Sequence, residues 1–226
     1  MFSVDRSSAP YLLRAFQKLE HAEDLAFRGR VRFVDVHYYK DIEDPARRDG
    51  SEGSGQLRVP SNSVETLHID SATGKTLGST FAPGYLNFGS TYIHPVYALC
   101  MSGPGVDLSF LRRKMGRYVV RIRDPERLVD DVVESLQECP IPDREVFFVH
   151  LLPVEYKKGL VGAKPDDTVR LSYAQKPPDF VDECEYRLVI GVSGVRPDVP
   201  VEFFLTLRSA GEYCELLRDA KDGRPT

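Results

Sequence analysis

The fold is decided by the stretch Lys176-Pro177-Pro178-Asp179-Phe180-Val181-Asp182-Glu183-Cys184-Glu185-Tyr186-Arg187, which runs directly into Leu188-Val189-Ile190-Gly191-Val192. The second part is a short, uninterrupted run of aliphatic residues, which is typical of a buried strand. Two consecutive prolines remove two backbone donors, so the first part cannot join the sheet. The period of a strand places Glu183 and Glu185 on one face, at the point where a loop becomes a strand. Such a pair of carboxylates is a candidate functional site.

The composition is that of an ordinary globular chain. It has 226 residues, 42% hydrophobic and 28% charged, so we expect one domain over residues 1–226 with a polar tail from about residue 219. No apolar run approaches the roughly 20 residues needed to cross a bilayer, and residues 1–10 lack the pattern of a signal peptide. We therefore expect a cytoplasmic protein. The formal net charge of -4 argues against extensive coating by nucleic acid but leaves room for a local basic patch.

The cysteines and histidines predict neither disulfides nor a metal site. The cysteines lie far apart in apolar surroundings, without metal-ligand spacing, at Cys100, Cys139, Cys184 and Cys214. We expect all four to be reduced thiols. The five histidines are scattered, with no cysteine or carboxylate at ligand spacing.

Strands dominate the predicted elements, and the few helices do not alternate regularly with them. This pattern predicts a single α+β domain with a mixed or mostly antiparallel sheet. We expect that sheet to include residues 30–36, 91–100, 146–154 and 186–192. One helix is predicted over residues 19–28 with Gly29 as its C-cap, and the clearest helix runs from Asp124-Pro125 to about residue 139.

Several further elements follow from local signals. Strands over residues 64–69 and 76–81 are expected to form a hairpin, followed by a Gly/Pro loop over residues 83–89. The strand over residues 201–207 is expected beside the one over 183–192. Asp107 is a predicted helix cap, and Ser209 is predicted to cap a final helix reaching residue 217.

The N-terminal elements resemble the start of ADP-ribosyltransferase-type folds. Arg14 lies on the first predicted strand, the helix ends in Phe27-Arg28-Gly29, and Arg32-Phe33 lies on the next strand. Those folds open with a strand carrying Arg or His, then a helix, a glycine and a second strand. Glu183-Cys184-Glu185 is similar to the Glu-x-Glu that they carry at the mouth of a late strand. Gly89-Ser90-Thr91-Tyr92 resembles part of their Ser-Thr-Ser strand, without the closing serine.

Most of the chain also resembles a large uncharacterised bacterial family. Its members end with a lysine, a spacer bearing Pro or Trp, and Glu-x-Glu-Tyr-Arg. They also carry a Cys-x-Ser strand similar to Cys100-Met101-Ser102. This resemblance implies no known activity.

The transferase resemblance implies an enzyme that consumes NAD by splitting its glycosidic bond. The transition state is an oxocarbenium ion on the ribose, which a carboxylate at the 2′-hydroxyl stabilises. The resemblance gives that part to Glu185 and places Glu183 toward the acceptor. Arg14 would hold a phosphate or the ribose of NAD.

Other residues would support that site. Ser90 or Thr91 would steady the strand that carries the glutamate, and Tyr38 or Tyr39 would stack on nicotinamide. The acceptor would be a protein or a nucleic acid, as in a bacterial toxin or an anti-phage defence component.

Two alternatives remain beside this hypothesis. In the first, the protein is a non-catalytic binding module, and Glu185 and Arg187 are charges on an exposed strand. In the second, it is a metal-dependent nuclease that uses the carboxylates Asp179, Asp182, Glu183 and Glu185. The sequence shows no companion lysine for such a site, and Arg187 is a poor substitute for one.

Overall fold

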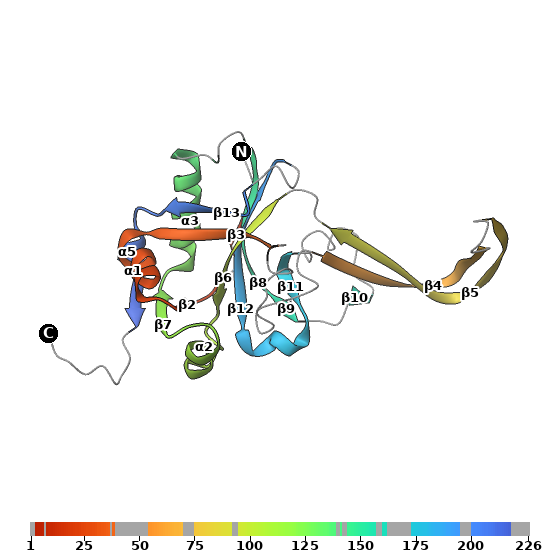
Figure 1. The fold of residues 1–226 in the computed structure, drawn as a ribbon, viewed down its shortest axis with the longest axis horizontal. Helices are drawn as coiled ribbons and strands as arrows, with labels where there is room; N and C mark the ends of the chain where they lie inside the picture. Colours follow the sequence, from red (N-terminus) through yellow and green to blue (C-terminus); the bar gives the residue numbers. More distant parts are fainter. Residues whose placement is uncertain are drawn as a thin grey trace.

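A curled, mostly antiparallel sheet forms the body of the molecule in the computed structural model (Figure 1). Its main path runs β1 (Ser3–Arg6), β8 (Val146–Pro153), β12 (Glu185–Val192), β6 (Val96–Ser102), β2 (Leu12–Phe16), β7 (Tyr118–Ile122) and β14 (Cys214–Leu217). Two more strands branch from β6: β3 (Arg30–Asp35) pairs with it, and β13 (Glu202–Thr206) pairs with β3. All pairs in this sheet are antiparallel except β1 with β8.

The structure describes most of the chain. The described residues are 3–6, 8–36, 38, 54–69, 75–91, 95–138, 141, 144–156, 160–161, 173–194 and 200–217. In these ranges the helices are α1 (Leu19–Arg28), α2 (Leu108–Lys114), α3 (Pro125–Glu138) and α5 (Ala210–Tyr213), with a 3-10 helix η2 (Pro178–Glu183).

The core lies between the sheet and helices α1 and α3. Leu25 of α1 and Leu128 of α3 are almost completely buried, in one cluster with Leu151 and Ile190 of the sheet. Burying each such side chain stabilises the fold by about 1.5 to 3 kcal/mol. The amphipathic stripe of α3, read from the sequence, therefore faces the core as expected.

The α+β fold class and the main strands are confirmed. Strands β3, β8 and β12 match the predicted ranges to within one residue and belong to one sheet with β6. The strand predicted over residues 91–100 is corrected at its start: β6 begins at Val96, and Thr91 ends strand β5 (Thr76–Thr91), which lies outside this sheet. Two predicted helix caps are also confirmed: the carboxylates of Asp107 and Asp124 accept hydrogen bonds from the backbone N–H groups of Ser109 and Arg127, each at 2.9 Å.

Gly29 ends α1 as predicted. Its φ of 66° is left-handed, and a Cβ at this position would lie only 1.9 Å from the carbonyl oxygen of Leu207. Both the backbone conformation and the close approach of the next segment therefore require glycine here.

The C-terminal region differs from the prediction in two places. Strand β13 pairs with β3 and not with β12, because both edges of β12 are already occupied by β6 and β8. The final helix is a single turn, after which β14 pairs with β7. Pairing at this sheet edge satisfies the backbone of residues 214–217, so it overrides their helical pattern.

Strands β4 (Ser54–Ile69) and β5 (Thr76–Thr91) form a long hairpin that projects from the body (Figure 1). The predicted hairpin is confirmed, but it is longer than expected and absorbs the predicted loop over residues 83–89. Prolines are tolerated here because, among the described residues, the only strand that pairs with the outside of this hairpin is the two-residue β10 (Leu160–Val161).

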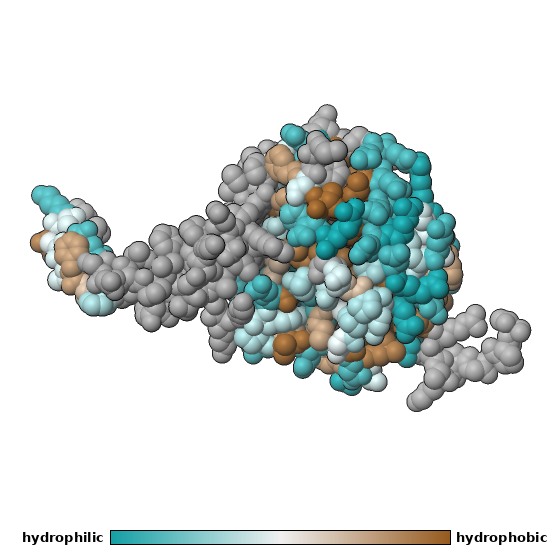
Figure 2. All heavy atoms as spheres, turned by 180° about the vertical axis from the view of Figure 1, so that it is seen from behind, coloured by the Kyte–Doolittle hydropathy of each residue, from teal (hydrophilic) through white to brown (hydrophobic). Residues whose placement is uncertain are grey.

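The surface is mixed in character. Figure 2 shows one face of the body, where hydrophilic residues predominate and hydrophobic residues lie in small groups among them. None of the helices in the described ranges has the length and apolar character that crossing a membrane requires.

Candidate functional site

The two candidate glutamates are joined by a strained turn and not by regular strand. Glu183 ends η2, Cys184 adopts a left-handed conformation with φ 44°, and Glu185 begins β12. Cys184 is the one residue other than glycine with positive φ in the described part of the chain. The strand periodicity used in the sequence argument therefore fails here. The carboxylates still converge, because the left-handed residue turns the chain between them.

The segment after β6 holds this turn in place. The backbone N–H of Gly103 donates to the carbonyl oxygen of Cys184 at 2.7 Å. A Cβ on Gly103 would lie 2.6 Å from the ring of Tyr186, so only glycine allows this approach. Non-glycine residues with positive φ cost about 1 to 3 kcal/mol and cluster at functional sites.

Lys176 connects the two glutamates. Its ammonium donates to Glu183 Oε2 at 2.9 Å and lies 2.7 Å from Glu185 Oε2. Glu183 is held from its other side by Lys114, at the end of α2, whose ammonium lies 3.0 Å from Oε1. The ring of Phe180 lies between the two lysines, with its centre 4.9 Å from Lys176 Nζ and 5.4 Å from Lys114 Nζ.

Glu185 also forms a fully buried ion pair with Arg187. Nε of Arg187 donates to Glu185 Oε1 at 2.7 Å, and its Nη1 donates to the carbonyl oxygen of Tyr173 at 2.9 Å. Glu185 is 5% exposed and Arg187 1% exposed, so the interpretation of these residues as charges on an exposed strand is wrong. Leaving either charge without the other would be costly at this depth.

The cations decide the ionisation of Glu185. Burial alone would raise the pKa of its carboxyl, but the charges of Arg187 and Lys176 and their hydrogen bonds outweigh burial and lower the pKa to about 2. Glu185 is therefore an anion at neutral pH, suited to stabilising positive charge and unsuited to donating a proton.

The backbone of Glu185 is positioned by two neighbouring segments. Its N–H donates to the hydroxyl oxygen of Tyr156 at 2.7 Å, and its carbonyl accepts from Val154 N–H at 2.9 Å. Burial raises the pKa of Tyr156 to about 12, so the phenol stays protonated. Strand β9 (Glu155–Tyr156), which carries this tyrosine, pairs with β11 (Gln175–Lys176), so one small sheet positions both Tyr156 and Lys176.

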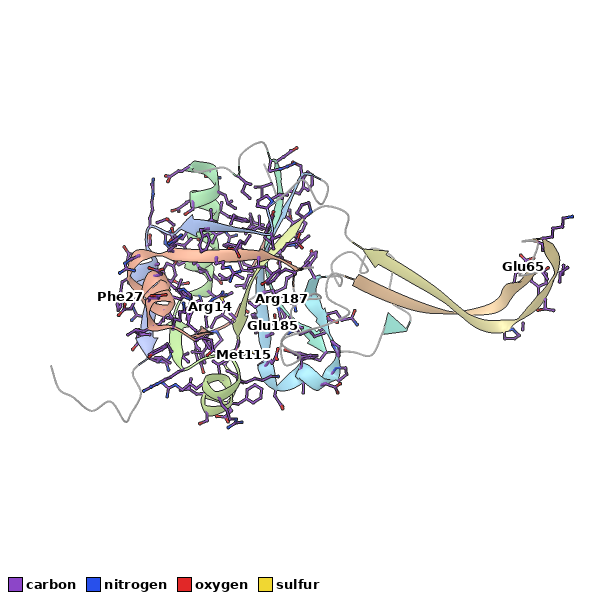
Figure 3. All side chains as sticks on the ribbon, in the orientation of Figure 1. Arg14, Phe27, Glu65, Met115, Glu185 and Arg187 are labelled. Carbon is purple, nitrogen blue, oxygen red and sulfur yellow. The ribbon has the colours of Figure 1, made fainter. Side chains whose placement is uncertain are left out.

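Lys176, Glu183, Glu185 and Arg187 line a cavity of about 190 Å³, which we call the glutamate cavity. Arg14 of β2 lines it together with Glu185, as the sequence predicts, and donates from Nη1 to the carbonyl oxygen of Cys100 at 2.8 Å. Figure 3 shows Arg14, Met115 and Glu185 in the same part of the molecule, each on a different element. Leu111 and Met115 form part of an apolar wall.

The other expected residues lie elsewhere. Tyr38 is exposed and is not among the residues that line the glutamate cavity, and Tyr39 lies outside the described residues. Ser90 and Thr91 belong to β5 and pair with Gly55 and Ser54 of β4. They cannot steady β12 through strand pairing, because the neighbours of β12 are β6 and β8.

Sequence reasoning missed both lysines of the site. Lys176 lies in the quoted stretch, seven residues before Glu183, and the two prolines with the turn that follows fold it back onto the glutamates. That signal was present in the sequence. Lys114 comes from α2, 69 residues away from Glu183, and nothing in its local sequence marks it.

The proposed nuclease carboxylates do not gather. Asp179 and Asp182 are exposed, whereas Glu183 and Glu185 are buried and face lysines. Within the described ranges, no group of three or more histidine, cysteine, aspartate or glutamate residues could hold a metal ion. A divalent cation would have to displace Lys176 from both glutamates.

Comparison with known proteins gives no relative: no family model, curated protein or solved structure matches this chain. The chemistry of the site follows from its residues alone. Two carboxylates, Glu183 and Glu185, are accompanied by four cations, Arg14, Lys114, Lys176 and Arg187. The excess of positive charge favours a ligand that carries anionic groups, such as phosphates.

Proposed function

We propose that the glutamate cavity is the active site of an NAD-consuming, ADP-ribosyltransferase-like enzyme. The observation that carries this proposal is the position of an ionised, buried glutamate, Glu185, in one cavity with Arg14. Splitting NAD produces positive charge on the ribose, and a fixed carboxylate stabilises that charge. The surrounding cations suit the pyrophosphate of the same molecule.

The reaction needs only modest chemistry from the protein. The bond between ribose C1′ and nicotinamide breaks, and nicotinamide leaves with the electron pair as a neutral molecule. Glu185 stabilises the oxocarbenium ion that remains. An acceptor nucleophile then bonds to C1′ and releases its proton, for which Glu183 is the candidate base; in hydrolysis a water molecule bonds to C1′ instead and releases its proton to solvent.

The ion pairs of the site set a condition on this mechanism. Both oxygens of Glu185 contact cations, Arg187 through Oε1 and Lys176 through Oε2. A ribose hydroxyl must therefore compete with Lys176 for Oε2. A phosphate that enters the cavity offers Lys176 an alternative anion, so ligand binding itself would release the carboxylate of Glu185.

The size of the cavity fits part of the substrate. Sites for whole ligands of drug size measure about 300 to 1,000 Å³. At about 190 Å³ the glutamate cavity has room for a ring and part of a sugar. The rest of a dinucleotide would extend outside it.

Release of nicotinamide from NAD by the purified protein tests the proposal, with a bacterial lysate supplying protein and nucleic-acid acceptors. We expect Glu185→Gln to lower the rate by about 100-fold or more, the scale of losing one preorganised electrostatic group. NAD binding, measured by calorimetry, should change much less because Arg14 remains. Glu183→Gln should reduce transfer to acceptor and spare hydrolysis.

Glu215→Gln is the matched control, because it makes the same chemical change on an exposed residue of β14. It should leave nicotinamide release unchanged. Wild-type protein that neither binds nor consumes NAD with these acceptors present overturns the proposal.

The second candidate function is a non-catalytic module that binds a phosphorylated ligand. The observation that favours it is that both glutamates already have cationic partners within the fold. Under this alternative the protein binds NAD or another phosphorylated ligand without releasing nicotinamide, and Glu185→Gln weakens binding only through loss of stability.

A further inference from the structure

A second cavity lies where the sheet divides. Strands β2 and β3 both pair with the edge of β6 that faces away from β12, β3 at Tyr97–Ala98 and β2 at Ser102. Helix α1 connects β2 to β3, so the two strands separate on either side of it. The guanidinium of Arg14 reaches the carbonyl oxygen of Cys100, between the two paired segments.

This second cavity, which we call the arginine cavity, has a volume of about 380 Å³. That volume lies in the range of small-molecule sites. Its lining combines three arginines, two carboxylates and two aromatic rings: Arg14, Arg30, Arg32, Asp24, Glu202, Phe16 and Phe204. Arg14 lines the glutamate cavity as well, so the two cavities are neighbours.

The carboxylates of the arginine cavity are already engaged by arginines. Arg32 donates from Nε to Glu202 at 2.6 Å, and Asp24 pairs with Arg28 of the same helix. Arg30 has no carboxylate partner among the described residues, and it is exposed. The cavity therefore has a net positive charge with room for an anion near Arg30.

The aromatic rings add a flat binding surface. Phe204 is 47% exposed, and the guanidinium of Arg30 lies 4.5 Å from its ring centre. The guanidinium of Arg14 lies 5.3 Å from the ring centre of Phe16. One exposed phenylalanine is ordinary on a protein surface. Two arginine–aromatic pairs around a single cavity form the combination that binds a base by stacking and a phosphate by charge.

We infer that the arginine cavity binds a nucleoside phosphate. The base stacks against Phe204 and the guanidinium of Arg30, and the phosphate lies among the arginines. A purely apolar ligand would leave the charge of Arg30 without an anion, and a cationic ligand would be repelled. The inference goes beyond the proposed function because it requires no cleavage of NAD. The same chemistry is offered by a free nucleotide and by the phosphorylated end of a nucleic-acid strand.

Calorimetric titration with three probes tests this assignment: AMP, adenosine, which lacks the phosphate, and ribose 5-phosphate, which lacks the base. We expect AMP to bind more tightly than either fragment, and its affinity to fall as salt is raised. Equal binding of AMP and adenosine overturns the role of the arginines. Equal binding of AMP and ribose 5-phosphate overturns the role of the ring.

Two substitutions locate the site. Phe204→Ala and Arg30→Gln each change an exposed side chain, so the fold should be unaffected. Each should weaken AMP binding by about tenfold or more, the scale of losing one stacked ring. Phe27→Ala on α1 is the matched control for the ring, because Phe27 is 68% exposed and is not among the residues that line the arginine cavity. AMP affinity that is unchanged in both cavity variants overturns the assignment.

A final arm separates the two sources of the ligand. If a short single-stranded oligonucleotide with a 5′-phosphate binds more tightly than AMP, the ligand is the end of a nucleic-acid strand. If AMP binds more tightly than the oligonucleotide, the ligand is a free nucleotide. This outcome is independent of NAD consumption. If the protein binds AMP through Phe204 but releases no nicotinamide, the proposed function is overturned and the assignment of the arginine cavity stands.

Discussion

Two of the buried carboxylates, Asp131 and Glu185, differ in what surrounds them. Asp131 of α3 is completely buried, and its carboxylate accepts from the backbone N–H groups of Arg208 and Ser209 and from the hydroxyl of Tyr213, each at 2.9 Å. Glu185 is almost as deeply buried but faces two cations and a cavity. Neutral donors around Asp131 join α3 to the C-terminal segment. Charges around Glu185 keep an anion ready at a place that a ligand can reach.

The comparison teaches that burial of a carboxylate does not by itself indicate function. Both groups have polar partners: Asp131 accepts hydrogen bonds at both oxygens, whereas Glu185 accepts one from Arg187 at Oε1 and has the ammonium of Lys176 beside Oε2. Asp131 has neutral partners and does not line either of the cavities described above, so its role is structural. One partner of Glu185, Lys176, lines the glutamate cavity, where a ligand can compete for its ammonium. The distinction suggests four experiments, in order of decreasing effect.

The largest effect should come from breaking the ion pair of Glu185. Glu185→Gln leaves Arg187 buried without a full countercharge, which should lower the free energy of unfolding by about 3 to 5 kcal/mol. Urea denaturation measures this change. The double variant Glu185→Gln/Arg187→Met removes both charges and should recover much of the lost stability. A double variant that is stable and still releases nicotinamide at the wild-type rate would show that Glu185 is structural, like Asp131.

Lowering the pH should remove a stabilising contribution that only Glu185 provides. Its pKa is about 2 in the folded protein against an ordinary value of 4.5. Above the ordinary value the carboxyl is ionised in both states, and the contribution is complete. Between about pH 5 and about pH 2 the unfolded chain takes up a proton that the folded chain does not, so about 3 kcal/mol of stability is lost.

Urea denaturation at a series of pH values checks this, with Glu185→Gln/Arg187→Met as the reference for all other carboxylates. The stability of the wild-type protein relative to this double variant should fall by about 3 kcal/mol on acidification. A difference that stays constant with pH would contradict the depressed pKa of Glu185.

Some of this architecture was readable from the sequence. The apolar run over residues 188–192 predicted a buried strand, and the caps Asp107 and Asp124 predicted where two helices begin, because these signals are local. The partner of β13 was not readable, since which strand edges remain open depends on the whole sheet. The hairpin is longer than predicted because prolines usually end strands. Here Pro60 lies within β4 and Pro83 within β5, and proline is tolerated in strands that have an open edge.

The candidate site could be predicted only in part, because some of its residues carry local signals and others are placed by the packing of distant segments. Glu183, Glu185 and Arg14 carried a pattern, whereas Lys114 reaches the site from a distant helix and has no signal of its own. The burial of Arg187 also depends on its surroundings: an alternating charge on a strand is usually exposed, but this guanidinium is buried and binds the carbonyl oxygen of Tyr173, which comes from a separate segment. Local patterns therefore located the site, and the packing supplied its electrostatics.

Weakening the hydrogen bonds of Asp131 should reduce stability and leave the chemistry unchanged. In Asp131→Asn one acceptor oxygen becomes an amide donor that faces a backbone N–H, so the free energy of unfolding should fall by about 2 kcal/mol. Thermal unfolding measures the loss. The folded fraction of this variant should release nicotinamide at the wild-type rate per molecule. A lower rate per folded molecule would mean that the two carboxylates are coupled.

The smallest effect should come from Tyr156→Phe, which separates positioning from charge at Glu185. The substitution removes the hydroxyl that accepts from the backbone N–H of Glu185 at 2.7 Å but leaves both cations of the ion pairs in place. One buried N–H loses its partner, so stability should fall by about 1 kcal/mol. Loss of the fixed backbone should also lower nicotinamide release, by less than Glu185→Gln does, with NAD affinity nearly unchanged.

Tyr213→Phe is the matched control, because it removes a tyrosine hydroxyl from Asp131 at 2.9 Å and should cost similar stability without affecting the reaction. If both tyrosine variants slow the reaction equally, the hydroxyl of Tyr156 acts through stability alone and the positioning role is wrong.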